Sequence, residues 1–322
     1  MSRLAQAVFK GGGVKGIGLV GGLAVAEELG WRWKAVAGTS AGSITAALVA
    51  AGYRAPEVHK ILFDLDFRQF EDGGGIKPLN LFLHDGIYKG QFAIDFMDRL
   101  LGEKLGKQVV TFRDLPIACR VVASDLTHKR MLVFPDDLAA APYNLPDPLS
   151  FPVSHAVRAS ISIPFFFEPY RLTLPSGVKA THVDGGLLSN FPVHLFEPVG
   201  RAPLVPTFGF DLHAPSADQP LPTEKPLDLV KAMVETILGG RDRADLEHQN
   251  YARAILIDTG NYGTTQFDID DAGKDWLYQS GRKAAELFFA DPETEAWLRR
   301  FPYRLSPRTF AGQQKPLSEP GT

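Results

Sequence analysis

Cysteine is almost absent from this chain, which has one, Cys119, in 322 residues. A single cysteine excludes an intrachain disulfide framework and fits a reducing compartment. Long hydrophobic runs are also missing, because no stretch reaches the about 18 apolar residues of a transmembrane helix. The first residues, MSRLAQAVFKGGG, lack the hydrophobic segment of a signal peptide. We therefore expect a cytoplasmic protein, in peripheral contact at most with a membrane surface.

An excess of positive charge is missing as well. Lys and Arg together number 34 and Asp and Glu 37, which gives a formal net charge of -3. Nucleic-acid-binding domains are usually basic, so we expect no nucleic-acid partner. The composition, 45% hydrophobic and 22% charged, is that of an ordinary globular protein. The length permits one large domain or two small ones and does not decide between them.

A third absence decides how the glycine-rich stretch FKGGGVKGIG is interpreted. Gly11, Gly13 and Gly16 match the G-x-G-x-x-G pattern of a dinucleotide-binding turn. That fold needs an acidic residue roughly 20 positions further on to hold the ribose. No Asp or Glu occurs from Leu29 through Pro56. A Walker A loop fails too, because Lys15 is followed by glycine rather than Ser or Thr. A nucleotide cofactor is therefore not expected, and a nucleotide-binding module is a weak alternative.

Strand-like and helix-like segments alternate along the chain, which predicts an α/β fold with a largely parallel central sheet. The expected strands are residues 7–9, 33–38, 117–126, 131–134, 204–210 and 252–260. The expected helices are residues 17–29, 41–51, 56–64, 90–102, 227–238 and 271–290. Residues 71–90 combine glycines with an apolar stretch, which fits either a lid or a plain surface loop.

The segment GTSAG, residues 38–42, stands where the ribose acid would be. It is the G-x-S-x-G pattern of a nucleophile elbow, in which a sharp turn from strand to helix exposes a serine. Gly38 and Gly42 remove side chains that would collide across the turn, and Ser40 becomes a candidate nucleophile. An ordinary tight turn is the other interpretation, since Gly, Ser and Thr favour turns.

A serine nucleophile needs donors for the oxyanion. The amides of Gly11, Gly12 and Gly13 follow a strand and are suited to this role, with Gly12 and Gly13 the better candidates. Lys15 either adds positive charge near the anion or is a solvated lysine at the start of a helix. A bulky residue at Gly12 or Gly13 is expected to reduce turnover more than substrate binding.

The base is less evident. Four histidines follow the elbow, and none lies in a motif of its own: His182, His194, His213 and His248. His213 is the best of them, because it follows an expected strand. Asp184 lies in HVDGG, after a short apolar run. Asp-Gly alone predicts a hairpin turn.

The three motifs in order resemble the patatin-like phospholipase family: GGGVKG at 11–16, GTSAG at 38–42 and DGG at 184–186. The stretches ASDL at 123–126 and RASISIPFFFEP at 158–169 are also similar. The resemblance implies Ser40 as nucleophile, Asp184 as base, no histidine, and a glycine-loop oxyanion hole at Gly11, Gly12 and Gly13. Supporting motif residues would be Lys15, Gly16, Gly38, Gly42, Gly185 and Gly186. Lys10 departs from the family, which often has Asp there.

The resemblance also implies a three-layer α/β/α sandwich over residues 1–290, followed by an extension and flexible tail over 291–322. It implies hydrolysis of a phospholipid, lysophospholipid or neutral glyceride ester, with peripheral membrane contact. No metal or other cofactor is expected, and no D-x-D-x-D-G calcium loop occurs. Phe165, Phe166 and Phe167 either line an acyl channel or belong to the core.

Three alternatives are open at this point. One is a serine esterase or thioesterase that acts on non-lipid esters through a histidine-containing triad. The second is the nucleotide-binding module, and the third is a catalytically silent domain that binds a membrane or a partner. The histidine-free dyad that the resemblance implies is chemically demanding, because a carboxyl with an ordinary pKa of about 3.9 is a weak base. Partial burial of Asp184 would raise that pKa.

Overall fold

A computed structural model describes residues 3–73, 86–196, 204–213 and 254–301, together with four isolated positions between 223 and 236. Most of the expected lid at 71–90 lies outside these residues. So do His248, the tail beyond 301 and nearly all of the helix expected at 227–238. In the described part, no helix is long and apolar enough to cross a membrane.

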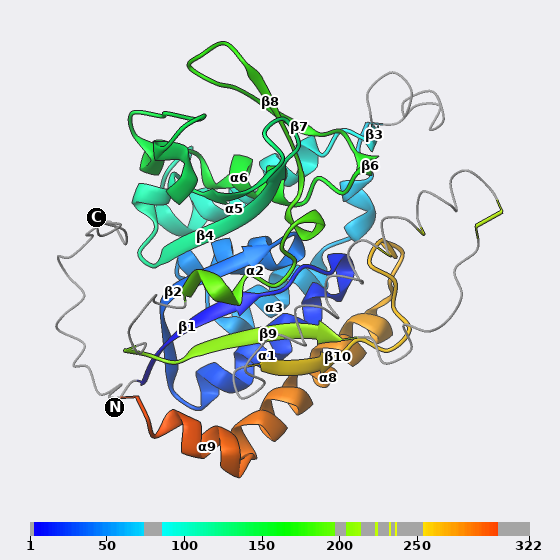
Figure 1. Cartoon of the computed structure of the whole chain (residues 1–322). Coiled ribbons are helices and arrows are strands. Elements are labelled where there is room, and N and C mark those ends of the chain that lie inside the picture. The colour runs from blue at the N-terminus through cyan, green and yellow to red at the C-terminus, as the bar shows by residue number, and fades with distance from the viewer. Residues whose placement is uncertain are drawn as a thin grey trace.

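The centre of the fold is an eight-stranded sheet in the order β10-β9-β1-β2-β4-β8-β7, with β5 also paired to β4 (Figure 1). The strands from β10 to β4 run parallel, and β5, β8 and β7 are antiparallel to their neighbours. Their bounds are β1 Arg3–Phe9, β2 Trp31–Thr39, β4 Ala118–Asp125, β5 Arg130–Phe134, β7 Tyr170–Thr173, β8 Lys179–Asp184, β9 Thr207–His213 and β10 Ala254–Asp258. A separate parallel pair joins β3 Gly86–Tyr88 to β6 Phe165–Phe167.

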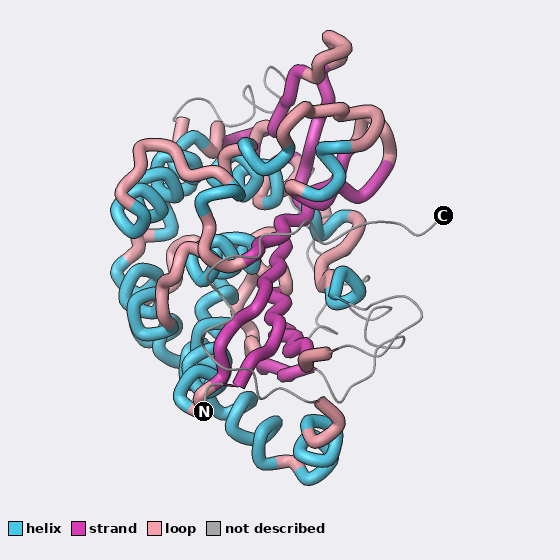
Figure 2. The backbone as a smooth tube through the Cα atoms, turned by 90° about the vertical axis from the view of Figure 1, so that its left-hand side faces the viewer, coloured by secondary structure: helices cyan, strands magenta, loops and turns pink. Residues whose placement is uncertain are grey.

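Helices cover one face of the sheet in a thick layer (Figure 2). They are α1 Ile17–Glu28, α2 Ala41–Ala50, α3 Ala55–Asp64, α5 Gln91–Leu105, α6 Val153–Ser160 and α8 Asp271–Ala290. The short helix α9 Pro292–Leu298 follows α8 at the bottom of the molecule, outside this layer. The opposite face is covered more thinly, where Phe191, Val193 and Phe196 pack on Val8 and Ala35 of the sheet. The sheet thus lies between two layers, and the predicted α/β/α sandwich is confirmed.

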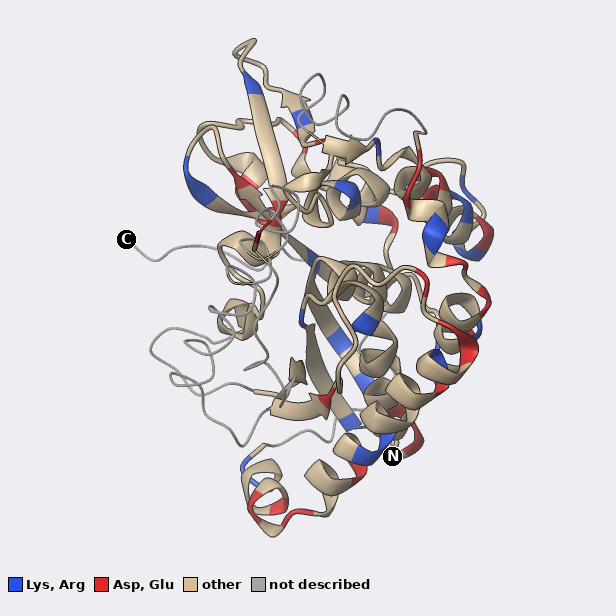
Figure 3. Cartoon of the chain, turned by 90° about the vertical axis from the view of Figure 1, so that its right-hand side faces the viewer, with Lys and Arg blue, Asp and Glu red and all other residues tan. Residues whose placement is uncertain are grey.

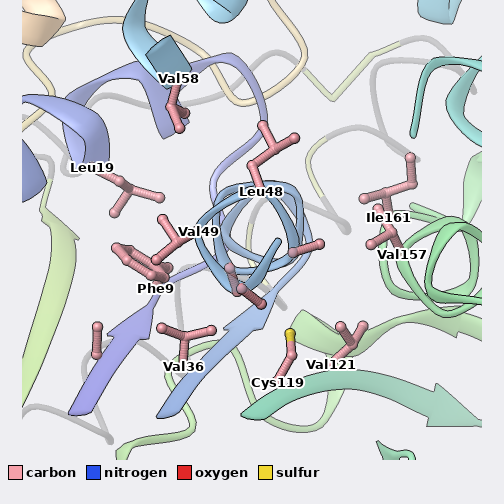
Figure 4. Close-up of a cluster of buried hydrophobic side chains, with 14 of the residues drawn as sticks. Phe9, Leu19, Val36, Leu48, Val49, Val58, Cys119, Val121, Val157 and Ile161 are labelled. Atoms are coloured by element: carbon pink, nitrogen blue, oxygen red, sulfur yellow. The ribbon is translucent and has the colours of Figure 1, made fainter. Parts of the chain in front are cut away.

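The main core lies around α2, which rests on β1, β2 and β4. Figure 4 shows Val49 of this helix beside Phe9 and Val36 of the strands, and Leu48 on the side of the helix away from the strands. The short side chains of α2 allow this close approach, since Ala46, Ala47 and Ala50 are completely buried. Cys119 is buried here, and burial raises the pKa of its thiol to about 12. It is a small core residue rather than a reactive one.

Several elements differ from their expected bounds. Strand β9 ends at His213, so this residue belongs to the strand rather than following it. Helix α6 and the strand β8 that ends in Asp184 were not expected, because each is too short to display a clear period. Beyond residue 290, α9 packs its Trp297 edge-on against Phe208, with 6.2 Å between ring centroids.

Charged residues of both signs are mixed along the outer helices (Figure 3). They form short-range pairs such as Arg282 with Glu28, between α8 and α1, at 2.7 Å. Exposed pairs of this kind contribute about 0–1 kcal/mol each, so the buried core holds the fold together.

Candidate active site

Ser40 lies at the turn between β2 and α2, as the elbow pattern predicts. Its backbone has φ 51° and ψ −128°, a left-handed conformation that is rare for a residue with a side chain. Glycine is required at positions 38 and 42 because backbone atoms of neighbouring segments approach closely at both positions. A Cβ on Gly38 would lie 2.2 Å from the carbonyl oxygen of Gly42, and one on Gly42 would lie 2.1 Å from that of Phe9. The ordinary-turn interpretation therefore gives way to a strained elbow.

Asp184 meets Ser40 from a different strand. Ser40 Oγ donates a hydrogen bond to Asp184 Oδ2 at 2.6 Å, although the two residues are 144 positions apart. Strand β4 separates β2 from β8, and its residues Val122 and Ala123 are in register with Thr39 and Asp184. The carboxyl ends of β2 and β8 therefore present the hydroxyl and the carboxyl to each other across β4.

Burial changes the acidity of Asp184. Its side chain has no exposed surface, and this desolvation raises the pKa to about 6 from an ordinary value near 4. Hydrogen bonds from Ser40 and from the Gly186 amide, which donates to Oδ1 at 2.8 Å, partly offset the rise. A carboxylate with a pKa near 6 is a stronger base than an ordinary aspartate and is still ionised at neutral pH.

Of the four candidate histidines, the three that the structure describes take no part in this arrangement. His182 is completely buried, and its Nε2 is 2.7 Å from the Tyr143 hydroxyl, which donates to Asp125. His194 lies in a short 3-10 helix on the opposite face, and His213 ends β9. Among the residues that the structure describes, no histidine is hydrogen-bonded to Ser40 or Asp184. The geometry favours the histidine-free dyad over a triad.

The glycine loop passes directly against the serine. A Cβ on Gly11 would be 3.0 Å from Ser40 Cβ. Gly13 has φ 58°, and a Cβ there would be 1.8 Å from the carbonyl oxygen of Thr264. One expectation changes here, because the Gly11 amide donates to the carbonyl oxygen of Asn190 at 3.1 Å and is not free for an oxyanion. The amides of Gly12 and Gly13 have no acceptor in the described part of the chain. The candidate oxyanion donors narrow to these two.

The remaining motif residues support the loop and the turn. Gly16 lies against Ala41, the first residue of α2, with 3.1 Å between its ideal Cβ position and that of Ala41. Gly185 passes over β4, where a Cβ would be 2.2 Å from the Val122 carbonyl oxygen. Lys15 is half-buried in the 3-10 turn Gly13–Gly16, which leads into α1. Both interpretations of its charge stay open.

Lys10, the departure from the family pattern, has a buried partner. Its Nζ donates to Asp211 of β9 and, at 3.0 Å, to the carbonyl oxygen of Leu212. Both charged side chains are at most 2% exposed. A buried charge is tolerated when it is paired and hydrogen-bonded, so this ion pair anchors the start of the glycine loop to the neighbouring strand.

An apolar pocket opens at Ser40, with about 570 Å³ of empty space, part of it open to solvent. Its lining comes from the glycine loop and the start of α1, from α2, from α3 and the turn after it, from the segment after α6, and from the loop before α8. The residues are Gly13, Gly16, Ile17, Ser40, Ala41, Ile44, Thr45, Leu62, Leu65, Phe67, Phe70, Ile161, Ile163, Phe167 and Phe267. The three consecutive phenylalanines at 165–167 lie in different environments. Phe167 lines the pocket, Phe166 packs on Phe267, and Phe165 is 43% exposed.

The described residues around Ser40 do not form a metal-binding site. In the described ranges, no group of three His, Cys, Asp or Glu side chains is placed to hold a metal ion. The residues around Ser40 instead provide a hydroxyl, a carboxyl and two amides, which are the groups that acyl transfer requires.

Sequence reasoning missed Ser160, whose Oγ accepts the Ser40 amide at 2.8 Å. The segment RASIS, residues 158–162, is similar to the family, but a single serine in a helix has no pattern that indicates a contact 120 residues away. It also missed Asn190, which orders the glycine loop through its carbonyl oxygen.

This chain is similar to several known proteins. YqhO of Bacillus subtilis (strain 168), an uncharacterized protein, is 38% identical over 291 residues, which cover 87% of this chain and 96% of that protein. The cUMP-AMP-activated phospholipase of Escherichia coli is 26% identical over 190 residues, 56% of this chain and 54% of that protein. The crystal structure of VipD from Legionella pneumophila has the same fold, with a TM-score of 0.56 and 18% identity. That match covers 89% of this chain and 66% of VipD, so this chain spans slightly less than two thirds of it.

The model of one protein family matches residues 7–197, a range that includes the glycine loop, the elbow and the Asp-Gly-Gly motif. This range is more than half of the chain. The match to this family model supports lipid hydrolysis as the general activity. The chain therefore belongs to the patatin-like phospholipase family.

Proposed function

We propose that this protein hydrolyses acyl esters of lipids, of the phospholipase A or lysophospholipase type, with Ser40 as nucleophile and Asp184 as general base. The hydrogen bond of 2.6 Å between Ser40 Oγ and Asp184 Oδ2 carries the proposal. It joins a strained, nearly buried serine to a carboxyl whose burial raises its pKa to about 6. The apolar pocket beside them is suited to an acyl chain.

The reaction would proceed in two halves. Asp184 Oδ2 accepts the proton of Ser40 Oγ while Oγ forms a bond to the acyl carbonyl carbon. The carbonyl oxygen becomes an oxyanion, and the amides of Gly12 and Gly13 donate to it. Asp184 then gives the proton to the departing alkoxide. In the second half a water loses a proton to Asp184 while its oxygen bonds to the acyl carbon. The bond between that carbon and Ser40 Oγ then breaks, Asp184 returns the proton to Oγ, and the carboxylic acid departs.

The N-terminus of α2 would add to the stabilisation of the oxyanion. The amides of the first turn of a helix are unpaired and its dipole is positive at that end. Ser40 immediately precedes Ala41, the first residue of α2. The developing negative charge would therefore form at a favourable position, without a charged side chain.

Contact with a lipid surface is part of the proposal. A membrane lipid must leave its neighbours to place an ester at Ser40, so an apolar residue near the pocket would help to anchor the protein. Phe165 is 43% exposed and lies two residues before Phe167, which lines the pocket. We place the catalytic unit within residues 1–290.

The pH dependence of kcat/KM should follow Asp184. The carboxylate is the active form, so kcat/KM should rise with pH and level off above an inflection near 6, the pKa of this group in the free enzyme. A short-chain p-nitrophenyl ester measured between about pH 4 and 8 tests this. Circular dichroism at each pH controls for unfolding. A flat profile across this range would exclude Asp184 as the base.

The pocket should set the preferred length of the acyl chain. Ile44 lines it from α2, one turn after Ser40, and is only partly buried. Tryptophan at this position would fill space that an acyl chain needs. At about 0.8 kcal/mol per buried CH₂, exclusion of two methylenes lowers kcat/KM about tenfold.

We therefore expect Ile44→Trp to lose about tenfold in kcat/KM for octanoyl esters and little for acetyl esters, which serve as the internal control. Equal losses on both esters would show that the pocket does not hold the acyl chain. Comparing phospholipid, lysophospholipid and triglyceride substrates with the same pair of proteins would then identify the lipid class.

A further inference from the structure

The backbone of Ser40 needs an external support. A non-glycine residue in a sparsely populated conformation costs about 1–3 kcal/mol and persists only where its surroundings hold it. Ser40 is such a residue, with φ 51°. Its base comes from β8, which is not paired with β2. Something other than strand pairing must therefore hold the serine in place toward the carboxyl.

Ser160, the last residue of α6, provides that support. The backbone amide of Ser40 donates to Ser160 Oγ at 2.8 Å. The Ser160 hydroxyl in turn donates to the carbonyl oxygen of Val122 on β4 at 2.6 Å. A hydroxyl has one hydrogen, and since β4 accepts it, a lone pair is left for the Ser40 amide. The side chain is completely buried, so water does not compete for either bond.

The same turn also holds the base. The Asp184 amide donates to the carbonyl oxygen of Ser162 at 2.8 Å. Ser162 is itself held by Arg158, whose guanidinium donates to Ser162 Oγ and to the carbonyl oxygens of Lys89 and Glu168. Two residues of one short segment thus bind the backbones of both members of the dyad.

We infer that Ser160 is a positioning residue, which holds Ser40 in the strained conformation that directs its Oγ at Asp184. This assignment rests on the proposed function. The occupied Ser40 amide also leaves the oxyanion to the amides of Gly12 and Gly13. Without the Ser160 hydroxyl, the Ser40 amide would be buried without an acceptor, and the turn would relax toward an ordinary conformation. A shift of about 1 Å in a reacting atom can cost on the order of 100-fold in rate.

The test compares Ser160→Ala with a matched control, Ser154→Ala. Ser154 is also completely buried in α6, but its hydroxyl has no partner among the described residues. Both variants and the wild-type protein are treated with a fluorophosphonate probe, and the second-order rate of labelling is measured. Ser160→Ala should be labelled at least about tenfold more slowly and lose a similar factor in kcat, with KM changed less than about twofold. Ser154→Ala should match the wild type.

Each outcome is decisive. Labelling of Ser160→Ala at the wild-type rate would overturn the positioning role while leaving Ser40 as nucleophile. A wild-type protein that the probe does not label would overturn the proposed function, and this inference with it. If Ser160→Ala fails to fold, Ser160→Cys replaces it, because it keeps most of the volume but is a weak acceptor. Slower labelling of the cysteine variant supports the role, and unchanged labelling contradicts it.

Discussion

Replacing Ser40 by alanine should abolish ester hydrolysis. The substitution removes the oxygen that we propose forms the acyl-enzyme, and the amides of the glycine loop alone cannot replace a nucleophile. We expect kcat to fall by at least about 10³-fold, as in other serine hydrolases that lose one member of the catalytic unit. The measurement is turnover of a p-nitrophenyl ester and of a lysophospholipid, with protein concentration fixed by absorbance.

The control for this loss of activity is a measurement that Ser40→Ala still folds. Ser40 is 5% exposed and its Oγ contacts Asp184, so alanine leaves a small cavity and a buried carboxyl without its hydroxyl partner. We expect this to change the free energy of unfolding by about 1–3 kcal/mol, too little to account for a complete loss of activity. Retention of more than about a tenth of the wild-type kcat in a folded Ser40→Ala protein would rule out Ser40 as the nucleophile.

Asp184→Asn should lose activity and gain stability, a combination that a purely structural aspartate would not show. Asparagine has nearly the same shape, and its side-chain oxygen can still accept the Gly186 amide. It has no carboxylate to accept the proton of Ser40, so we expect a loss in kcat of at least about 10³-fold.

The stability effect depends on pH with a defined sign. In the folded protein the pKa of Asp184 is raised to about 6 from 3.8, so the folded state holds this proton more tightly than the unfolded chain. As pH rises through this interval the buried carboxylate increasingly destabilises the fold, and above about pH 6 the full penalty, on the order of 3 kcal/mol, is present. Asparagine avoids it. Below about pH 4 the carboxyl is protonated in both states and the advantage disappears.

Thermal unfolding of the two proteins near pH 8 and near pH 4 tests this sign. The Tm of Asp184→Asn should exceed that of the wild type by a few degrees at the higher pH and equal it at the lower. A lower Tm for the variant near pH 8 would mean that the carboxylate stabilises the fold, against the assignment of a buried, activated base.

The catalytic motifs could be recognised from the sequence because each demands particular residue types over a short span. GTSAG must form a tight turn with glycine two positions before and two positions after the serine, and the structure explains both glycines by backbone contacts near 2 Å. The apolar residues before and after GTSAG predict strand β2 and helix α2. The family resemblance rested on these same local patterns and was confirmed by the family match over residues 7–197.

What the sequence did not reveal depends on contacts between distant segments. The glycine pattern includes Gly11 among the oxyanion donors, but the carbonyl oxygen of Asn190, far along the chain, accepts its amide. Lys10 looked like an isolated departure, and its partner Asp211 lies 201 positions away on β9. Ser160 shows no periodic signal because its role comes from one hydrogen bond. Such partners follow from the order of strands in the sheet, which short motifs do not encode.

The chemical identity of the nucleophile is the central claim, and mapping the site of a fluorophosphonate adduct tests it most directly. The wild-type protein is labelled, digested and sequenced by mass spectrometry. We predict one adduct, on Ser40, in the peptide that contains GTSAG. The adduct should be absent when Asp184 is replaced by asparagine, because the serine then has no base. An adduct on another residue, or none on the folded wild-type protein, would contradict the account.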